Sequence, residues 1–293
     1  MPAGVYQMKN SRDSNVIDEQ AVASHYGDAA LLERLLAGLE ASGLDIEHLQ
    51  PADLAPIEEF HIGGRKATEY VVDSLALATD QHVLDVGCGI GGAVRYIADT
   101  IGCRVTGVDL TPEYIHAAKA LSRHTGLHDR TRFDTGSALA MAYDDEHFDA
   151  VITLHAAMNI ADREALYAEI ARVLKPGGVL CVYDVMKKSD EPIAFPVPWA
   201  ASADTSHLIT RDETLSLLDE AGFAVHRVDD RTRFAIEFFR ESLARVADGP
   251  SPLGVHLVMG ETAQLKFRNT LDGIERGCIG PVQVVARKRA MAA

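Results

Sequence analysis

The sequence VLDVGCGIGG, residues 83–92, is a short apolar run that ends in a carboxylate and a cluster of glycines. This order predicts a buried strand, a tight turn and the start of a helix. Because glycines lack a Cβ atom, a ligand can approach the turn closely, and the first N–H groups of the helix point outward. The spacing satisfies both GxGxxG, the dinucleotide fingerprint, and GxGxG. On its own it also fits a tight turn that binds nothing.

Two aspartates indicate which ligand the turn would take. Asp85 lies two residues before Gly87. A carboxylate there is unfavourable for a pyrophosphate but suits an ammonium or sulfonium cation. Asp109 ends the next predicted strand, where an acid can accept both hydroxyls of a ribose. The pair therefore predicts a cationic nucleoside, and S-adenosylmethionine has both features.

Strand and helix patterns alternate on both sides of this segment. Strands are predicted at residues 83–86, 104–109, 132–135, 148–154, 179–184, 223–228 and 282–286, and helices at 64–77, 93–101, 112–125, 163–174 and 211–221. Residues 175–178, Lys-Pro-Gly-Gly, predict a stop and turn before the fifth strand. The order predicts a doubly wound, mostly parallel seven-stranded α/β sheet with right-handed crossovers.

The chain is predicted to consist of an extension and a larger domain. Residues 1–63 would form an N-terminal helical extension or lid, including a helix from Asp18 to about Ala41. Residues 64–293 would form the α/β domain, with a helical insertion at about 231–278 before the last strand. The insertion carries an apolar stripe: Phe234, Ile236, Phe238, Phe239, Leu243 and Val246. Such a stripe predicts packing, either as a cap over a substrate crevice or as a subunit contact in a homodimer.

Composition excludes several classes of partner. The chain of 293 residues has 43 acidic and 28 basic residues and a formal net charge of −15, which argues against nucleic acid. Its apolar runs are too short to cross a membrane, and residues 1–25 lack the apolar region of a secretory signal. The 4 cysteines show no CxxC spacing. We therefore expect a cytoplasmic protein with no membrane partner, disulfide or metal.

The chain resembles the class I S-adenosylmethionine-dependent methyltransferases. The family's first motif is matched by residues 83–92, its second-strand acid by VTGVDLT (105–111), its fourth strand by FDAVITLHAAMNI (148–160) and its fifth by LKPGGVLCVYD (174–184). The resemblance covers about residues 64–230 in order. It implies a Rossmann-like fold, S-adenosylmethionine as cofactor and S-adenosylhomocysteine as product.

The resemblance also implies cofactor-binding residues. Asp85, Gly87 and Gly89 would line the methionine part of the cofactor, Asp109 would bind the ribose, and Leu110 would lie beside the adenine. Ser137 stands where the family often has an acid for the adenine amino group, so this contact would rest on the Ala138 backbone. The complete predicted set is Gly64, Asp85, Gly87, Cys88, Gly89, Asp109, Leu110, Ser137, Ala138 and Leu154.

A narrower resemblance concerns the methyl acceptor. EEFHIGGRKAT (58–68), HAAMNIAD (155–162), the Pro196–Trp199 segment and residues 253–287 are similar to the sarcosine and dimethylglycine N-methyltransferase group. This likeness implies N-methylation of a small amine or amino acid. Such an acceptor carries a carboxylate and needs a cationic anchor, for which Arg65 and Arg211 are the candidates.

The predicted catalytic residues are His155 and Asn159, which follow the fourth strand and should face the crevice at the carboxyl ends of the strands. His155 is the candidate base for a hydroxyl acceptor, whereas a neutral amine needs none. The alternatives are that His155 binds backbone or shapes the pocket, and that Asn159 caps a turn. Met158 follows the same strand and should face the same crevice.

The other predicted substrate residues carry alternatives of their own. His61 and Arg65 would lie over the cofactor and near an acceptor carboxylate, or belong only to the start of a helix. Trp199 would line the acceptor pocket, or anchor its loop by packing. The complete predicted substrate set is His61, Arg65, Met158 and Trp199.

Four functional hypotheses follow. The first is N-methylation of a small amine or amino acid, which needs a compact polar pocket with an arginine. The second is O- or C-methylation of a larger apolar metabolite with His155 as base, which needs a wide apolar pocket. The third is a nicotinamide-dependent oxidoreductase using GxGxxG, and the fourth is a non-catalytic nucleoside-binding protein. No Asn-Pro-Pro-Tyr or Asp-Pro-Pro-Tyr motif follows the fourth strand, which disfavours methylation of nucleic-acid bases.

Overall fold

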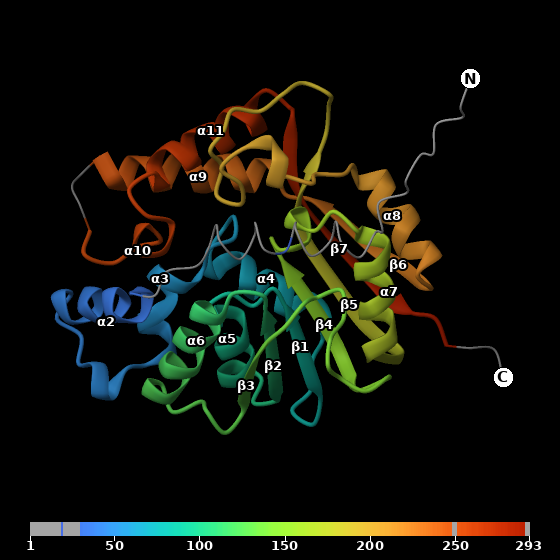
Figure 1. The fold of residues 1–293 in the computed structure, drawn as a ribbon, viewed down its shortest axis with the longest axis horizontal. Coiled ribbons are helices and arrows are strands. Elements are labelled where there is room, and N and C mark those ends of the chain that lie inside the picture. Colours follow the sequence, from blue (N-terminus) through green and yellow to red (C-terminus); the bar gives the residue numbers. More distant parts are fainter. Residues whose placement is uncertain (1–18, 20–29, 248–250, 291–293) are drawn as a thin grey trace, which may run out of the picture.

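A seven-stranded sheet with helices on both faces forms the centre of the molecule (Figure 1). The computed structural model describes residues 19, 30–247 and 251–290. The strand order is β3-β2-β1-β4-β5-β7-β6, in which β7 runs antiparallel to both neighbours and the other pairs are parallel. The predicted doubly wound, mostly parallel seven-stranded α/β fold is therefore confirmed.

The elements agree with the predicted ones, and most ends differ by one to three residues. The strands are β1 (His82–Val86), β2 (Arg104–Asp109), β3 (Thr131–Thr135), β4 (Phe148–Leu154), β5 (Leu174–Lys187), β6 (Phe223–Asp230) and β7 (Ile279–Lys288). The helices are α2 (Leu31–Ala41), α3 (Ala55–Glu58), α4 (Arg65–Leu75), α5 (Gly92–Thr100), α6 (Pro112–His124), α7 (Arg163–Val173), α8 (Arg211–Glu220), α9 (Thr232–Ala247), α10 (His256–Met259) and α11 (Ala263–Glu275). The first part of the predicted helix at residues 18–41 lies outside the described residues, apart from Glu19.

The turn predicted at residues 175–178 is wrong, because β5 already begins at Leu174 and continues through this segment. Leu174 pairs with Phe148 on β4, and the next pairs start at Val179 opposite Ala150. β5 thus advances five residues where β4 advances two, so the extra residues form a bulge inside the strand. The proline and glycines mark this bulge rather than the end of an element.

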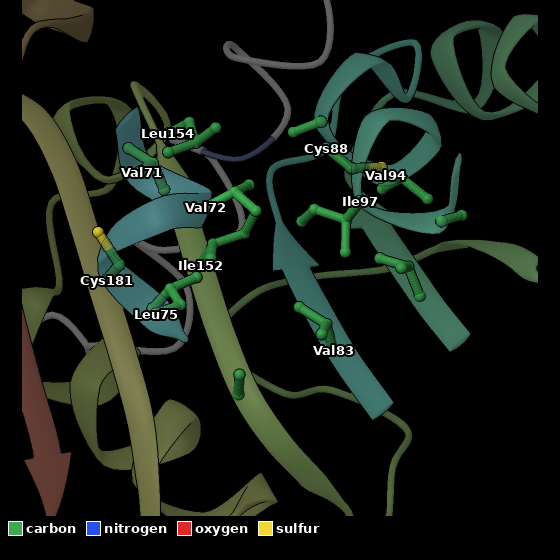
Figure 2. Close-up of a cluster of buried hydrophobic side chains, with 14 of the residues drawn as sticks. Val71, Val72, Leu75, Val83, Cys88, Val94, Ile97, Ile152, Leu154 and Cys181 are labelled. Carbon is green, nitrogen blue, oxygen red and sulfur yellow. The ribbon is translucent and has the colours of Figure 1, made fainter. Parts of the chain in front are cut away.

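Both faces of the central strands are buried, which explains why these strands are almost continuous apolar runs. On one face, α4 and α5 pack side chains against the strands (Figure 2). The other face carries α7 and α8. The side chains labelled in Figure 2 are Val71, Val72, Leu75, Val83, Cys88, Val94, Ile97, Ile152, Leu154 and Cys181.

Helices α9 and α11 lie side by side beyond the carboxyl ends of the strands, along the top of the view in Figure 1. They pack through aromatic rings, with 5.2 Å between the centroids of Phe239 and Phe267. The predicted apolar stripe on α9 is therefore a packing surface in this part of the chain, although the side chain of Val246 lies outside the described residues. Within the described ranges, no helix is long and apolar enough to cross a membrane.

Candidate active site

A cavity opens at the edge of the sheet where β1, β2 and β4 end. One end is lined by the glycine turn and acidic side chains, and the other by the loop after β5 and by α9, α10 and α11. Thirteen predicted site residues lie in its lining: His61, Asp85, Gly87, Cys88, Gly89, Asp109, Leu110, Ala138, Leu154, His155, Met158, Asn159 and Trp199. Gly64, Arg65 and Ser137 are not among the described lining residues.

The glycine turn is held against the end of β2. The backbone N–H groups of Gly87 and Cys88 donate to the carbonyl oxygen of Val108 at 2.8 and 3.1 Å. Gly87 has φ +80°, and a Cβ atom there would lie 2.2 Å from that of Ala156. Only glycine fits both the left-handed backbone and this close approach. The hydrogen bonds to Val108 on one side and the close contact with Ala156 on the other therefore fix the conformation of the turn.

The two aspartates predicted from the sequence lie together at this end. Asp85 is only 2% exposed, and its Oδ1 has no hydrogen-bond partner among the described residues. Burial and the nearby charges of Asp109 and Glu59 raise the pKa of Asp85 to about 8. Asp109 accepts backbone N–H bonds from Gly89 and Thr111, each at 2.9 Å. A buried carboxyl without a partner fits a cationic group of a ligand.

Two further acids, Glu58 and Glu59, line the same end and were not assigned from the sequence. Glu58 binds Arg95 at 2.5 Å and Arg65 at 2.9 Å, and Glu59 binds Arg65 at 2.8 Å and the hydroxyl of Thr68 at 2.7 Å. The adjacent acids in EEFHIGGR were the only signal in the sequence. This network occupies the guanidinium of Arg65 and favours a structural role for Arg65 over that of an acceptor anchor.

Of the two predicted histidines, His61 is buried and His155 is half-buried, and backbone atoms hold both. The Nδ1 of His155 donates to the carbonyl oxygen of Tyr183 at 3.1 Å, and its Nε2 accepts from the N–H of Ile62 at 3.4 Å. The Nε2 of His61 donates to the carbonyl oxygen of Gly64 at 3.1 Å. Burial lowers the pKa of His155 to about 3 and that of His61 to about 4. Both imidazoles are therefore neutral near pH 7, and both ring nitrogens of His155 take part in hydrogen bonds. These observations favour the alternative in which His155 shapes the pocket.

Asn159 and Trp199 hold the loop after β5 in place. The Nδ2 of Asn159 donates to the carbonyl oxygen of Trp199 at 2.6 Å. The indole N–H of Trp199 donates to Ser206 Oγ at 2.9 Å, and the ring is 2% exposed. Both residues line the cavity together with Met158. The contacts of Trp199 fit its loop-anchor alternative.

The residues at the remaining predicted positions lie beside the cavity. Gly64 precedes α4 with φ +52°, a left-handed conformation. The hydroxyl of Ser137 donates to the carboxylate of Glu19, and the N–H of Leu139 donates to Ser137 Oγ at 3.0 Å. Glu19 itself lines the cavity.

The far end of the cavity was not predicted from the sequence in detail. Phe238 and Phe239 from α9 and Phe267 from α11 form an aromatic wall. Lys266, on α11, lines the same region and is buried. Nothing in the sequence pattern distinguished this lysine from a solvated one. Among the described side chains, no group of three or more His, Cys, Asp or Glu is arranged to hold a metal ion.

Comparison with known protein families finds a match for the central segment. The profile of the family described as "Methyltransferase domain" matches residues 84–182. These residues are similar to the methyltransferases of that family. The expected resemblance to methyltransferases is thereby confirmed over these residues.

Curated proteins similar to this chain are methyltransferases, and where their names state an acceptor, the acceptors differ. They include methyltransferase GfsG of Streptomyces halstedii, 28% identical, covering 61% of this chain and 65% of that protein. Sterol 24-C-methyltransferase ERG6B of Gibberella zeae is 29% identical over 67% of this chain and 50% of that protein. Phosphoethanolamine N-methyltransferase 1 of Arabidopsis thaliana is 31% identical over 63% and 37%. The chain spans less than two thirds of the length of each.

Solved structures share the fold over most of the chain. A putative sarcosine dimethylglycine methyltransferase from Galdieria sulphuraria has a TM-score of 0.63 at 21% identity, covering 78% of this chain and 86% of that one. Geranyl diphosphate C-methyltransferase from Streptomyces coelicolor A3(2) has 0.67 at 17%, covering 98% and 100%. The [4+2]-cyclase SpnF has 0.67 at 22%, covering 93% and 96%. Since a cyclase shares the fold, the fold alone does not fix the reaction or its substrate. Both must be argued from the residues of the site.

Proposed function

We propose that the chain transfers a methyl group from S-adenosylmethionine to a small molecule with an apolar body. The observation that carries this proposal is the cavity itself. At one end it has a buried carboxyl without a hydrogen-bond partner beside a glycine turn, and at the other an aromatic wall. The first end suits a cationic nucleoside and the second an apolar acceptor.

The residues at the turn fit the cofactor. Asp85 would bind a cationic group, Asp109 the ribose hydroxyls, and Gly87 and Gly89 would admit the chain of the ligand close to the backbone. S-adenosylmethionine supplies an electrophilic methyl group on its sulfonium when it is bound. The protein orients the two reactants in line and excludes water, which are the main contributions an enzyme can make to such a displacement.

The acceptor end favours the larger apolar acceptor over a small amino acid. Its wall includes Phe238, Phe239, Phe267, Met158 and Trp199. No arginine is found among the described lining residues, and Arg65 is already paired with two carboxylates. A small zwitterion would therefore have no arginine to pair with its carboxylate. The lysine in the described lining, Lys266, lies beside the aromatic wall, which suits an acceptor with an apolar body.

The low basicity of His155 limits which acceptor atoms can react. With a pKa lowered to about 3 by burial, His155 is a weak base at neutral pH, so the acceptor should be a nucleophile that needs no deprotonation. A neutral amine, an ionised oxygen or a carbon nucleophile meets this condition. N-methylation of a small amine or amino acid is the second candidate, favoured by the likeness of residues 58–68 and by the sarcosine dimethylglycine methyltransferase among similar structures.

The covering segments belong to the same proposal. The extension at residues 1–63 and the helical insertion at about 231–278 would close the cavity over the reactants. Glu19, together with α9 and α11, already contributes to its lining. A closed cavity would keep water from the sulfonium carbon.

Two measurements test the proposal. Calorimetry with S-adenosylhomocysteine and with NAD⁺ separates a methyltransferase from the oxidoreductase hypothesis, and we expect binding of the former alone. Transfer of radiolabelled methyl groups is then compared between a panel of apolar acids, phenols and amines and a panel containing sarcosine and dimethylglycine. Labelling of the second panel alone would reverse the choice of acceptor, and cofactor binding without any transfer would favour a non-catalytic protein.

A further inference from the structure

Lys266 is a buried cation at the acceptor end of the cavity. It lies on α11, lines the cavity and is 8% exposed. Its Nζ donates to the carbonyl oxygen of Met259 at 3.2 Å, and across residues 30–247 and 251–290 no ion pair of this lysine is found. An ammonium has three N–H donors, so two of them have no protein acceptor in the described part of the chain.

The surroundings of Lys266 make this arrangement costly unless something else binds the ammonium. The residue next to it, Phe267, and the rings of Phe238 and Phe239 are apolar neighbours in the cavity lining. Burying an ammonium among apolar groups is unfavourable without a paired charge and hydrogen bonds. Burial accordingly lowers the pKa of Lys266. An anion entering the cavity would remove this cost.

Most acidic side chains of the cavity lie at its other end. Asp85, Asp109, Glu58 and Glu59 belong to the end formed by β1, β2 and the segment before α4, whereas Lys266 comes from the insertion. Arg65 and Arg95 already compensate Glu58 and Glu59. Asp162, which follows Met158 and Asn159, also lines the cavity, and its carboxylate caps α7 by accepting the N–H of Ala165 at 2.9 Å. Most carboxylates of the described lining thus lie at the cofactor end, and one ammonium lies within the aromatic acceptor end.

We propose that Lys266 determines acceptor specificity by pairing with an anionic group on the acceptor, so that the acceptor is an apolar or aromatic organic anion. This inference rests on the proposed function, which assigns the aromatic end to the acceptor. The aromatic wall holds the body of the molecule, and the ammonium fixes one end of it. A molecule held at both places would present one nucleophilic atom to the cofactor end.

The test uses two fluorescent probes that differ in one group. 8-Anilinonaphthalene-1-sulfonate carries an anionic sulfonate, and N-phenyl-1-naphthylamine has the same aromatic body without it. Both are titrated into the full chain saturated with S-adenosylhomocysteine, for the wild type and for Lys266→Met, which keeps the length of the side chain and removes the charge. The exposed Lys119→Met on α6 is the matched control.

We expect Lys266→Met to raise the dissociation constant of the sulfonate probe at least tenfold and to leave that of the neutral probe within about twofold, the change produced by ~0.4 kcal/mol. Lys119→Met should change neither. An equal loss for both probes would show a packing effect and overturn the inference. An unchanged affinity for the sulfonate probe, or a wild type that binds neither probe, would overturn it as well.

Failure of this inference can be told from failure of the proposed function. Binding of S-adenosylhomocysteine is measured on the same samples by calorimetry, and methyl transfer on the acceptor panels. A protein that binds the cofactor and methylates neutral apolar acceptors as well as acidic ones keeps the proposed function and loses the role of Lys266. A protein that prefers the sulfonate probe through Lys266 but binds no S-adenosylhomocysteine loses the proposed function alone.

Discussion

The two ends of the cavity are built in different ways. At the cofactor end, a glycine turn and two aspartates come from residues 85–109, and backbone hydrogen bonds hold them against the end of β2. At the acceptor end, side chains from β4, the loop after β5, α9 and α11 meet although more than 100 residues separate the first from the last. The first end is local in sequence and polar, and the second is assembled by tertiary packing and mostly aromatic.

This difference separates what the fold requires from what the acceptor requires. The turn after β1 must connect a strand to a helix and must also leave room for the ligand, so two requirements restrict its sequence. The insertion only has to pack and to leave space, so many sequences can satisfy it. We therefore expect substitutions at the cofactor end to affect stability and binding together, and substitutions at the acceptor end to affect the choice of acceptor.

The largest effect is expected for Gly87→Ala. The new Cβ atom would lie 2.2 Å from the Cβ of Ala156 at a residue with φ +80°. Backbone strain and overpacking together should lower the free energy of unfolding by about 2–4 kcal/mol and abolish binding of S-adenosylhomocysteine. Urea denaturation and calorimetry measure the two effects.

Gly43 provides the matched control, because it has φ +83° and no heavy atom within 4 Å of its would-be Cβ. Gly43→Ala should cost only the strain of the left-handed conformation, about 1–2 kcal/mol, and leave cofactor binding intact. Equal losses for the two substitutions would mean that the close approach to Ala156 contributes nothing.

Asp109→Ala should have the next largest effect. We expect cofactor binding to weaken by about 1–3 kcal/mol, since ribose hydroxyls would lose their acceptor. The carboxylate also accepts the N–H groups of Gly89 and Thr111, so the alanine variant disturbs the turn as well. Asp109→Asn separates the two effects because the amide retains an acceptor oxygen. An unchanged dissociation constant in both variants would contradict the ribose role.

The fold could be predicted from the sequence to a large extent because its signals are local. The central strands are buried on both faces, and this burial makes them almost continuous apolar runs, of which β1 ends directly before Gly87. The failure at Lys175–Gly178 has a physical cause. A proline and two glycines mark a departure from regular backbone, but they do not show whether the strand ends or forms a bulge.

The site could be predicted only where neighbouring residues in the sequence are neighbours in space. The glycine turn and its acids were identified on this basis. The engagement of Arg65 with two glutamates, and the burial that holds His155 neutral, depend on atoms brought together by packing. Lys266 is an extreme case, because only the arrangement of α9, α10 and α11 turns an ordinary helix residue into a cavity residue.

The pH dependence of the free energy of unfolding tests the cofactor end at Asp85. Its pKa of about 8 in the folded protein lies above the ordinary value near 3.8 of an unfolded chain. The folded state therefore binds more protons between pH 4 and 8, and the free energy of unfolding should fall as the pH rises through that window. In Asp85→Asn this fall should shrink, so that without cofactor the variant is more stable than the wild type at pH 8 by about 1 kcal/mol or more.

Urea denaturation at pH 5 and pH 8 measures the change for Asp85→Asn, and the exposed Asp99→Asn on α5 is the control. Cofactor binding should move the opposite way, because the amide cannot pair with a cation. An Asp85→Asn protein that shows the same pH dependence as the wild type would mean that Asp85 does not carry the raised pKa.

The smallest effect is expected for His155→Asn, which tests whether the acceptor end contains a base. Asparagine tolerates the φ of +53° found at this residue and can replace one of its hydrogen bonds. Because burial lowers the pKa of His155 to about 3, the wild type and the variant should show the same kcat/KM profile between pH 6 and 8. A general base contributes about 10²–10⁴-fold, so a decrease of that size for hydroxyl acceptors alone would restore His155 as the base. A change within about threefold for every acceptor would leave the histidine its structural role, in which it joins the end of β4 to the segment before α4 through the N–H of Ile62.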